Sequence, residues 1–374
     1  MQLNLKNLHT ILLIFSLSSV IAYTNQKQNT TKENTTAVAI AAQPSKADTD
    51  INKNINNLAN QTNNSLKLGI PIECNLGKDC FVLVYPDRDP SPNAIDFGCG
   101  TQTYNGHDGT DFGITDITAM TAGVKVKAAA AGKVIRLRDG VPDRRIENEK
   151  QAAEINNIGC GNAVILDHGN GWETFYCHLR QGSVTVKEGM QVEKGTVLGL
   201  VGLSGLTSFP HVHLGVRYQG KFVDPFVGIT DKPGCNIARN PLWEKSLDYI
   251  PTGLIKAGFT SQKPNNINEI WEGKYVETNL TENIPMLIFW VHPYGILAGD
   301  IEHIRLIDPG NKEVINYKKP IKSPNRINWV NYVGKKNTPE NPIAPGIWRG
   351  EYQLIRGDKV LIDIKREINL TRGN

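Results

Sequence analysis

Short apolar runs separated by glycine-rich turns dominate this chain, and no long helical period interrupts them between residues 66 and 238. In the clearest example, the run Ala163–Leu166 is followed by Asp-His-Gly-Asn-Gly at 167–171 and by a second run, Trp172–Leu179. This order is typical of strand, turn and strand, because glycine and asparagine favour tight turns between β-strands. The pattern therefore predicts an all-β fold.

The length of 374 residues suggests two folded domains and an additional segment, since a typical domain has about 150 residues. We expect one antiparallel β domain at 67–238, with the polar stretch 136–158 as a surface insertion containing one helical turn. Residues 239–374 contain short strand-like runs at roughly 10-residue spacing, which predicts a small accessory β-sandwich. The Pro- and Asn-rich stretch 240–272 is expected to connect the two domains.

The first 66 residues read as an export signal and a tether. Residues 1–22 contain Lys6, a serine-interrupted apolar run and small residues at its end, which is the order of a secretory signal peptide. The run is shorter than the roughly 18 apolar residues of a membrane span, although an uncleaved anchor is the alternative. Asn-rich residues 23–66 are expected to form a disordered tether or a pro-segment. The mature chain is thus predicted to be periplasmic or secreted, without stable membrane insertion.

Cysteine content and charge narrow the class further. The even count of six cysteines in an exported chain predicts disulfides, and the absence of C-x-x-C argues against zinc thiolates. Cys74 and Cys80 form the favoured pair; the other four allow three connectivities, among which Cys160–Cys177 is preferred. The 41 Lys+Arg and 37 Asp+Glu leave a net charge of only +4, which excludes a dedicated nucleic-acid binder.

Histidines are concentrated in the first β region, where five of the eight lie between residues 107 and 213. His107 and Asp111 are four residues apart, about 13 Å on an extended strand, so a turn must bring them to one metal. His211 and His213 would point to one face of a strand, about 7 Å apart. Two histidines and one aspartate, with an open fourth position, compose a catalytic zinc site.

These residues lie in a recognisable series of motifs. The chain resembles the lysostaphin-type (LytM-like) zinc metallo-endopeptidases, which cut peptidoglycan peptides, over about residues 105–226. The motifs are, in order, Gly-His-Asp-Gly-Thr-Asp-Phe (106–112), Val-Lys-Ala-Ala-Ala-Ala-Gly-Lys-Val (126–134), Gly-Asn-Ala-Val-Ile-Leu-Asp-His-Gly-Asn-Gly (161–171), Phe-Tyr-Cys-His-Leu (175–179), Gly-Met-Gln-Val-Glu-Lys-Gly-Thr-Val-Leu-Gly-Leu-Val-Gly (189–202), Pro-His-Val-His-Leu (210–214) and Val-Asp-Pro-Phe (223–226).

The resemblance implies an assignment for each of five side chains. His107, Asp111 and His213 would bind one Zn²⁺ per chain, and His178 and His211 would be the catalytic histidines. The implied reaction is attack of zinc-activated water on a peptide carbonyl of peptidoglycan, with an imidazole as the general base. The sequence does not decide whether the bond that is cut lies in a glycine-rich bridge or in a direct D-alanyl cross-link.

Two other readings compete with an active peptidase. Some members of this family have lost metal ligands and activate other wall hydrolases, and a catalytically silent wall-binding protein is possible even with all five positions intact. A lipoyl- or biotinyl-carrier-like module is the second rival, but no modifiable lysine occupies the turn at 202–205. The protein partner of residues 239–374, if there is one, is not identified by the sequence.

Overall fold

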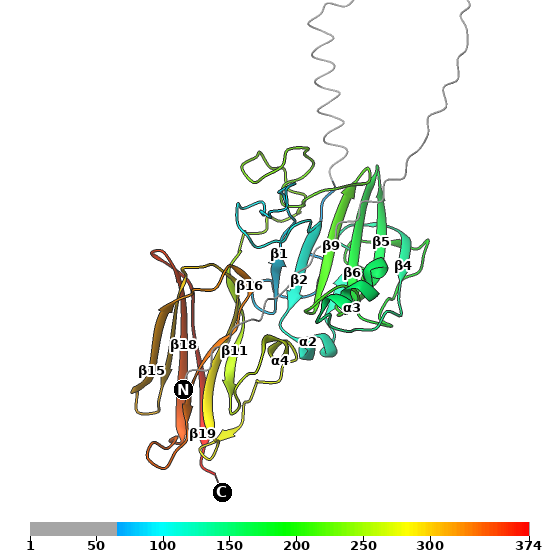
Figure 1. Ribbon diagram of the computed structural model, residues 1–374. Coiled ribbons are helices and arrows are strands. Elements are labelled where there is room, and N and C mark those ends of the chain that lie inside the picture. The colour runs from blue at the N-terminus through cyan, green and yellow to red at the C-terminus, as the bar shows by residue number, and fades with distance from the viewer. Residues whose placement is uncertain (1–65, 374) are drawn as a thin grey trace, which may run out of the picture. The chain divides into compact units, whose positions relative to one another are not determined.

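The computed structural model describes residues 66–373, and the chain from Lys67 onward forms one compact unit. Strands provide nearly all of its regular structure, which confirms the all-β prediction (Figure 1). The expectations for 1–22 and for 23–65 lie outside the described residues. In the part that is described, no helix is both long and apolar enough to cross a membrane.

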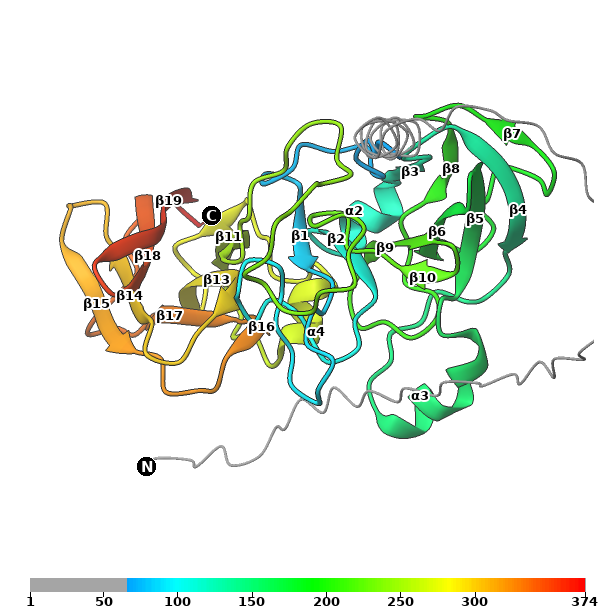
Figure 2. The ribbon, with the colours of Figure 1, turned by 90° about the horizontal axis from the view of Figure 1, so that it is seen from above.

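One eight-stranded antiparallel sheet organises the first half of the described chain (Figure 2). Its strands follow the spatial order β1 (Cys80–Val84), β2 (Gly109–Ile114), β9 (His211–Tyr218), β6 (Trp172–Leu179), β5 (Asn162–Gly169), β4 (Gly132–Arg138) and β7 (Gln191–Val192), with β10 (Lys221–Phe222) paired to β9. Strands β2 and β9 are neighbours, so Asp111 of β2 lies beside the two histidines of β9.

The predicted hairpin is present as β5 and β6. The turn between the two strands is Gly169-Asn170-Gly171. The backbone φ is 77° at Gly169, 52° at Asn170 and 83° at Gly171. Such left-handed backbone is accessible to glycine and asparagine, which explains the sequence of the turn. Alternate side chains of β6 then point to opposite faces of the sheet. Tyr176 is fully buried on one face, and its hydroxyl accepts a hydrogen bond from the Ala129 N–H at 2.7 Å.

Small elements complete this half. A two-stranded sheet pairs β3 (Lys125–Lys127) with β8 (Val197–Leu200). The short helices are α2 (Ile117–Ala122), α3 (Glu149–Glu154) and the 3₁₀ turn η1 (Asn156–Ile158). The helix expected within 136–158 is thus present as α3, but residues 136–138 continue strand β4 and do not belong to an insertion. Backbone pairing of β4 with β5 overrides their polar side chains.

The second half consists of two further sheets around a shared apolar core. One contains β11 (Gly253–Thr260), β13 (Met286–Ile296), β16 (Arg326–Asn328) and β17 (Asn331–Lys336). The other contains β12 (Leu280–Thr281), β19 (Lys359–Thr371), β18 (Gly346–Arg356), β14 (Ile301–Ile307) and β15 (Glu313–Pro320). Phe289 of β13 and Trp348 of β18 are both buried in this core, so the two sheets pack face to face.

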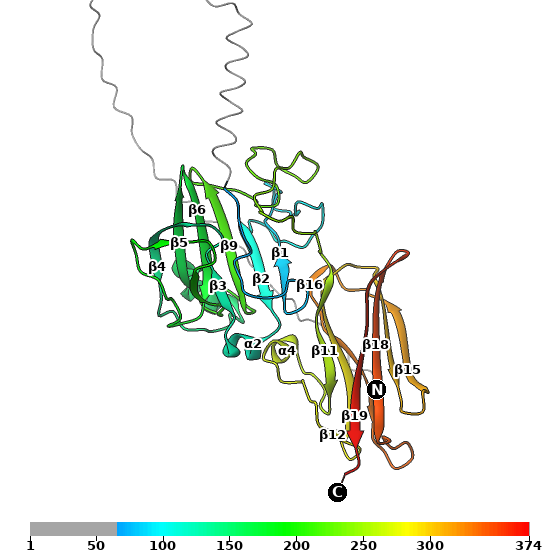
Figure 3. The same ribbon diagram turned by 180° about the vertical axis from the view of Figure 1, so that it is seen from behind.

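Residues 240–272 are more than the predicted connection, since they contain strand β11 and helix α4 (Ile267–Trp271). Helices α2 and α4 lie side by side (Figure 3). Asp116, which caps α2, also pairs with Lys256 of β11. An apolar cluster joins Phe81 and Leu83 of β1 to Trp271 and Tyr294. The domain boundary expected after residue 238 stays a prediction.

All six cysteines form disulfides within the described chain. The two favoured pairs, Cys74–Cys80 and Cys160–Cys177, are both present. The third bridge joins Cys99 to Cys235, residues 136 positions apart. This long bridge ties the loop before β2 to the segment that follows the first sheet.

Candidate active site

The first histidine motif is shaped by a turn that leads into β2. Gly106 has φ of 77°, and the His107 N–H donates to the Tyr104 carbonyl oxygen at 3.0 Å. Strand β2 begins two residues later, at Gly109. The turn brings His107 Nε2 to 3.1 Å from Asp111 Oδ1, which is the close approach that the spacing required.

The second motif lies on the neighbouring strand. His211 and His213 both belong to β9, and the β2–β9 register places Asp111 directly opposite His213. Asp111 Oδ1 is 2.9 Å from His213 Nδ1 and 3.5 Å from His211 Nε2. One carboxylate oxygen therefore contacts three imidazole rings. The structure brings together all three predicted metal ligands.

Backbone carbonyl groups fix the tautomers of three histidines. Nδ1 of His107 lies 2.8 Å from the Tyr85 carbonyl oxygen, Nδ1 of His178 2.8 Å from that of Ser204, and Nδ1 of His211 2.9 Å from that of Phe209. A carbonyl oxygen can only accept a hydrogen bond, so each Nδ1 must carry the proton. In the neutral ring each Nε2 then keeps a lone pair, as a metal ligand or a general base requires.

The cluster of His107, Asp111 and His213 fits a metal ion. One ligand atom from each residue lies within 4.8 Å of the others. The His107 Nε2 lone pair faces the Asp111 carboxylate, and two acceptors in such contact need a cation or a proton between them. Two imidazoles and a carboxylate are typical zinc ligands. Gly109 makes room for the cluster, because a Cβ there would lie 2.4 Å from His213 Nε2.

His178 reaches the same centre from the end of β6. Its backbone has φ of 61°, which is unusual for a residue with a side chain. The His178 N–H donates to the Cys160 carbonyl oxygen at 2.9 Å, and Cys160 is disulfide-bonded to the preceding residue, Cys177. The His178 ring centroid lies 4.6 Å from that of His211. Both predicted catalytic histidines thus lie beside the three candidate metal ligands.

The pKa values of the two proposed catalytic histidines shift in the opposite direction to that of the proposed metal ligand His213. Burial, followed by repulsion from His211 and His213, holds the pKa of His178 well below its ordinary value. Burial also lowers the pKa of His211. Burial of His213 acts in the same direction, but hydrogen bonds to Asp108 and Asp111 outweigh it and raise the pKa of His213 to about 10. The carboxylates therefore favour positive charge at the cluster, whereas His178 and His211 remain neutral bases.

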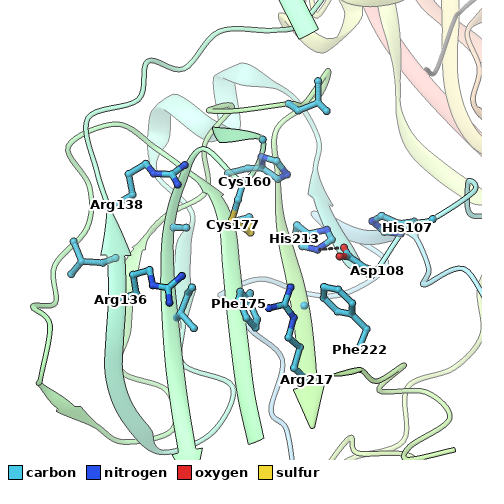
Figure 4. A pocket seen from close by; sticks show the side chains of 18 of the residues that line it. His107, Asp108, Arg136, Arg138, Cys160, Phe175, Cys177, His213, Arg217 and Phe222 are labelled. Carbon is cyan, nitrogen blue, oxygen red and sulfur yellow. Dashed lines mark ion pairs between the residues drawn. A yellow bond between two sulfur atoms is a disulfide. The ribbon is translucent and has the colours of Figure 1, made fainter. Parts of the chain in front are cut away.

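A groove of about 640 Å³ opens at this cluster and crosses one face of the large sheet (Figure 4). His213, Gly215 and Arg217 of β9 all face it, because alternate residues of a strand share a face. Phe175 and the Cys160–Cys177 bridge also line it.

Asp108, Arg217 and the arginines of β4 also line the site, although no role was predicted for them. Asp108 Oδ1 lies 3.4 Å from His213 Nε2, and this ion pair is visible in Figure 4. Arg217 could have been found from the strand period, since it is an even number of residues beyond His211 and His213. Arg136 and Arg138 carried no comparable signal, because their polar surroundings resembled an insertion.

Comparison with known proteins places the region that contains this site in a family. Residues 105–225 match the model of peptidase family M23, so this part of the chain is an M23 metallopeptidase domain. The match covers the whole cluster from His107 to His213.

Two curated relatives and one solved structure illustrate the likeness. The chain is 31% identical over 118 residues to peptidoglycan DD-endopeptidase ShyA of Vibrio cholerae, covering 32% of this chain and 22% of that protein. It is 43% identical over 67 residues to DD-carboxypeptidase/endopeptidase Mpg of Neisseria meningitidis, covering 18% of this chain and 15% of that protein. The solved structure of a zinc-containing peptidase from Vibrio cholerae is 25% identical in sequence, with a TM-score of 0.25. The match covers 40% of this chain and 41% of that chain. The chain thus spans about a fifth of the length of these curated relatives.

Proposed function

We propose that this chain hydrolyses peptide cross-links of bacterial peptidoglycan and that His107, Asp111 and His213 hold one zinc ion for the reaction. The observation that carries the proposal is the convergence of five side chains with complementary roles. Three offer metal ligand atoms within 4.8 Å of one another, and two neutral histidines stand beside them. The family match and the relatives named as peptidoglycan endopeptidases support the choice of substrate.

The bound ion would act as a Lewis acid on the peptide carbonyl and would lower the pKa of water. The protein itself moves the proton. The Nε2 lone pair of His178 or His211 accepts a proton from water as its oxygen bonds to the carbonyl carbon. The same proton passes to the leaving nitrogen when the C–N bond breaks. While protonated, that Nε2–H can donate a hydrogen bond to the oxyanion.

Fixed tautomers prepare both histidines for this role. The Ser204 and Phe209 carbonyl groups hold the Nδ1–H of His178 and His211, respectively, so no tautomer change precedes proton transfer. The lowered pKa of each ring keeps Nε2 unprotonated near neutral pH. A general base is effective only in that state.

We also propose that the protein acts outside the cytoplasm. Three disulfides and no free cysteine in the described chain suit an oxidising compartment such as a periplasm or the extracellular space. The signal peptide predicted at 1–22 would supply the route.

The direct test is digestion of purified peptidoglycan by the full chain, with and without a chelator, followed by mass spectrometry of the released peptides. We expect chelator-sensitive release of shorter cross-link fragments, whose masses identify the bond that is cut. Zinc binding without any release would contradict the peptidase proposal and favour a wall-binding or activating role.

A further inference from the structure

The groove carries a set of cations that the proposed chemistry does not use. Three of its lining residues are arginines, namely Arg217 on β9 and Arg136 and Arg138 on β4. Its one lining carboxylate is Asp108, which is paired with His213. Figure 4 shows these arginines along the same face as the cluster, across the strands from β9 to β4. The groove is therefore cationic along its length.

Aromatic rings hold the Arg217 guanidinium in place. Its Cζ lies 4.3 Å from the centroid of the Phe175 ring and 4.2 Å from that of Phe222 (Figure 4). Cation–π contacts of this kind fix a guanidinium without consuming its N–H donors. An arginine held between two rings is prepared for a ligand, because little side-chain entropy is lost on binding.

One donor of the Arg217 guanidinium lacks a protein partner among the described residues. Its Nε is buried and makes no hydrogen bond within the described chain. Glu173 lies opposite Arg217 in the β6–β9 register, yet no ion pair of 4.0 Å or less joins them among the described residues. A buried donor without a partner costs free energy, and a ligand oxygen would relieve that cost.

The arginines of β4 extend the positive charge to the far side of the groove, where Arg138 Nη1 donates one hydrogen bond to the Gly161 carbonyl oxygen at 3.1 Å. Both side chains are exposed, and no ion pair within the described residues involves either of them. Strand β4 is separated from β9 by β6 and β5, so it lies about 14 Å from β9 at the usual strand spacing. Arg217 is four residues beyond His213, or about 13 Å along β9. Arg217 and the arginines of β4 are therefore each about four extended peptide residues from the candidate metal ligands.

We propose that the groove selects peptides with free carboxylates, and that Arg217, together with Arg136 and Arg138, binds those carboxylates. This inference rests on the proposed function and narrows its substrate to anionic peptides, in contrast to uncharged glycine-rich bridges. Arginine matches a carboxylate with two parallel N–H donors, which gives geometric selectivity as well as affinity. Carboxylates at this distance hold the substrate without contacting the scissile bond.

The test uses the full chain and a soluble cross-linked disaccharide-peptide dimer released from bacterial peptidoglycan. In a second sample of the same dimer, the free carboxylates are converted to carboxamides, which preserves size and removes charge. Binding of both dimers is measured by calorimetry in the presence of a chelator, so that carboxylate–metal contacts do not contribute. Cleavage of both dimers is measured separately with zinc.

We expect amidation to weaken binding at least tenfold and to lower kcat/KM by a similar factor. Arg217→Gln should weaken binding of the carboxylate dimer about tenfold and leave the amidated dimer nearly unaffected. Arg136→Gln, a change on an exposed site, should act in the same direction even if Arg217→Gln folds poorly. The matched control is Lys133→Gln, which removes an exposed cation of β4 outside the groove and should change neither value.

Each outcome separates the two proposals. Equal binding and cleavage of both dimers would overturn the carboxylate site and leave the peptidase proposal intact. Selective binding of the carboxylate dimer without cleavage of either dimer would support the site and contradict the peptidase. Absence of both binding and cleavage would contradict both proposals.

Discussion

Asp111 is the residue on which the site converges, because one of its oxygens lies within 3.5 Å of imidazole nitrogens from three histidines. It is almost fully buried, and burial alone would raise the pKa of its carboxyl group. The surrounding imidazoles, His107 and His211 foremost, outweigh burial and hold that pKa well below its ordinary value. The carboxylate is therefore charged and available as a metal ligand at neutral pH.

A different buried histidine, His292, predicts acid sensitivity. It is fully buried on β13, neither ring nitrogen has a hydrogen-bond partner in the described chain, and it packs against Trp271. Burial, with a contribution from the Lys256 cation on the paired strand β11, lowers the pKa of His292 to about 3. The unfolded chain then binds a proton more readily than the folded chain. The contribution of His292 to stability is complete above about pH 6.5 and is lost as the pH falls toward 3.

For this single group, lowering the pH from 7 to 5.5 should reduce the free energy of unfolding by about 1 kcal/mol. His292→Leu removes the titrating ring. The free energy of unfolding of this variant should therefore fall by about 1 kcal/mol less than that of the unchanged protein between these two pH values. Urea unfolding of both proteins at both pH values measures the difference. Equal drops in the two proteins would show that His292 does not titrate between the folded and unfolded states as described.

At the scale of elements, helix α4 is connected to the proposed catalytic site although it lies outside residues 105–225. The Trp271 ring stacks on Phe209 with centroids 5.4 Å apart, and Phe209 stacks on His211 at 4.5 Å. The Phe209 carbonyl oxygen also accepts the hydrogen bond that fixes the His211 tautomer. A continuous stack of rings thus links α4 to one of the two proposed bases.

Trp271→Ala should therefore affect both stability and turnover. Removing a buried tryptophan typically costs about 3–5 kcal/mol of unfolding free energy. At a temperature where the variant remains folded, we expect kcat to fall several-fold with little change in KM, because His211 loses its support and the groove does not. Trp271→Phe should restore much of both properties. A variant that loses stability but keeps the kcat of the unchanged protein would limit Trp271 to a structural role.

The strand elements could be predicted from sequence where local patterns were strong. The Gly169-Asn170-Gly171 turn and the strands on either side were anticipated, as was the strand that contains His211 and His213. Helix α4 and the strand position of Arg136 were not anticipated. Both depend on tertiary packing and on pairing with a distant strand, which override local polarity and propensity.

At the scale of the whole molecule, the sequence identified all five converging side chains but not the groove around them. His107, Asp111, His178, His211 and His213 stood out through spacing and through their resemblance to a family. The groove crosses four strands, and the two outer ones, β4 and β9, are far apart in sequence, so Arg138 and Arg217 could be placed on it only by the sheet order. The Cys99–Cys235 pairing likewise depended on the fold, because residues 136 positions apart leave no local signal.

The most direct test of the central claim compares bound zinc and turnover in two variants of the full chain. His178→Ala should retain about one zinc per chain, as measured by mass spectrometry of the metal, and lose at least a hundredfold in peptidoglycan cleavage. His213→Ala should lose both the metal and the activity, because it removes one of three proposed ligands. Full cleavage by His178→Ala, or full cleavage by a protein that contains no metal, would contradict the assignment of a zinc peptidase site.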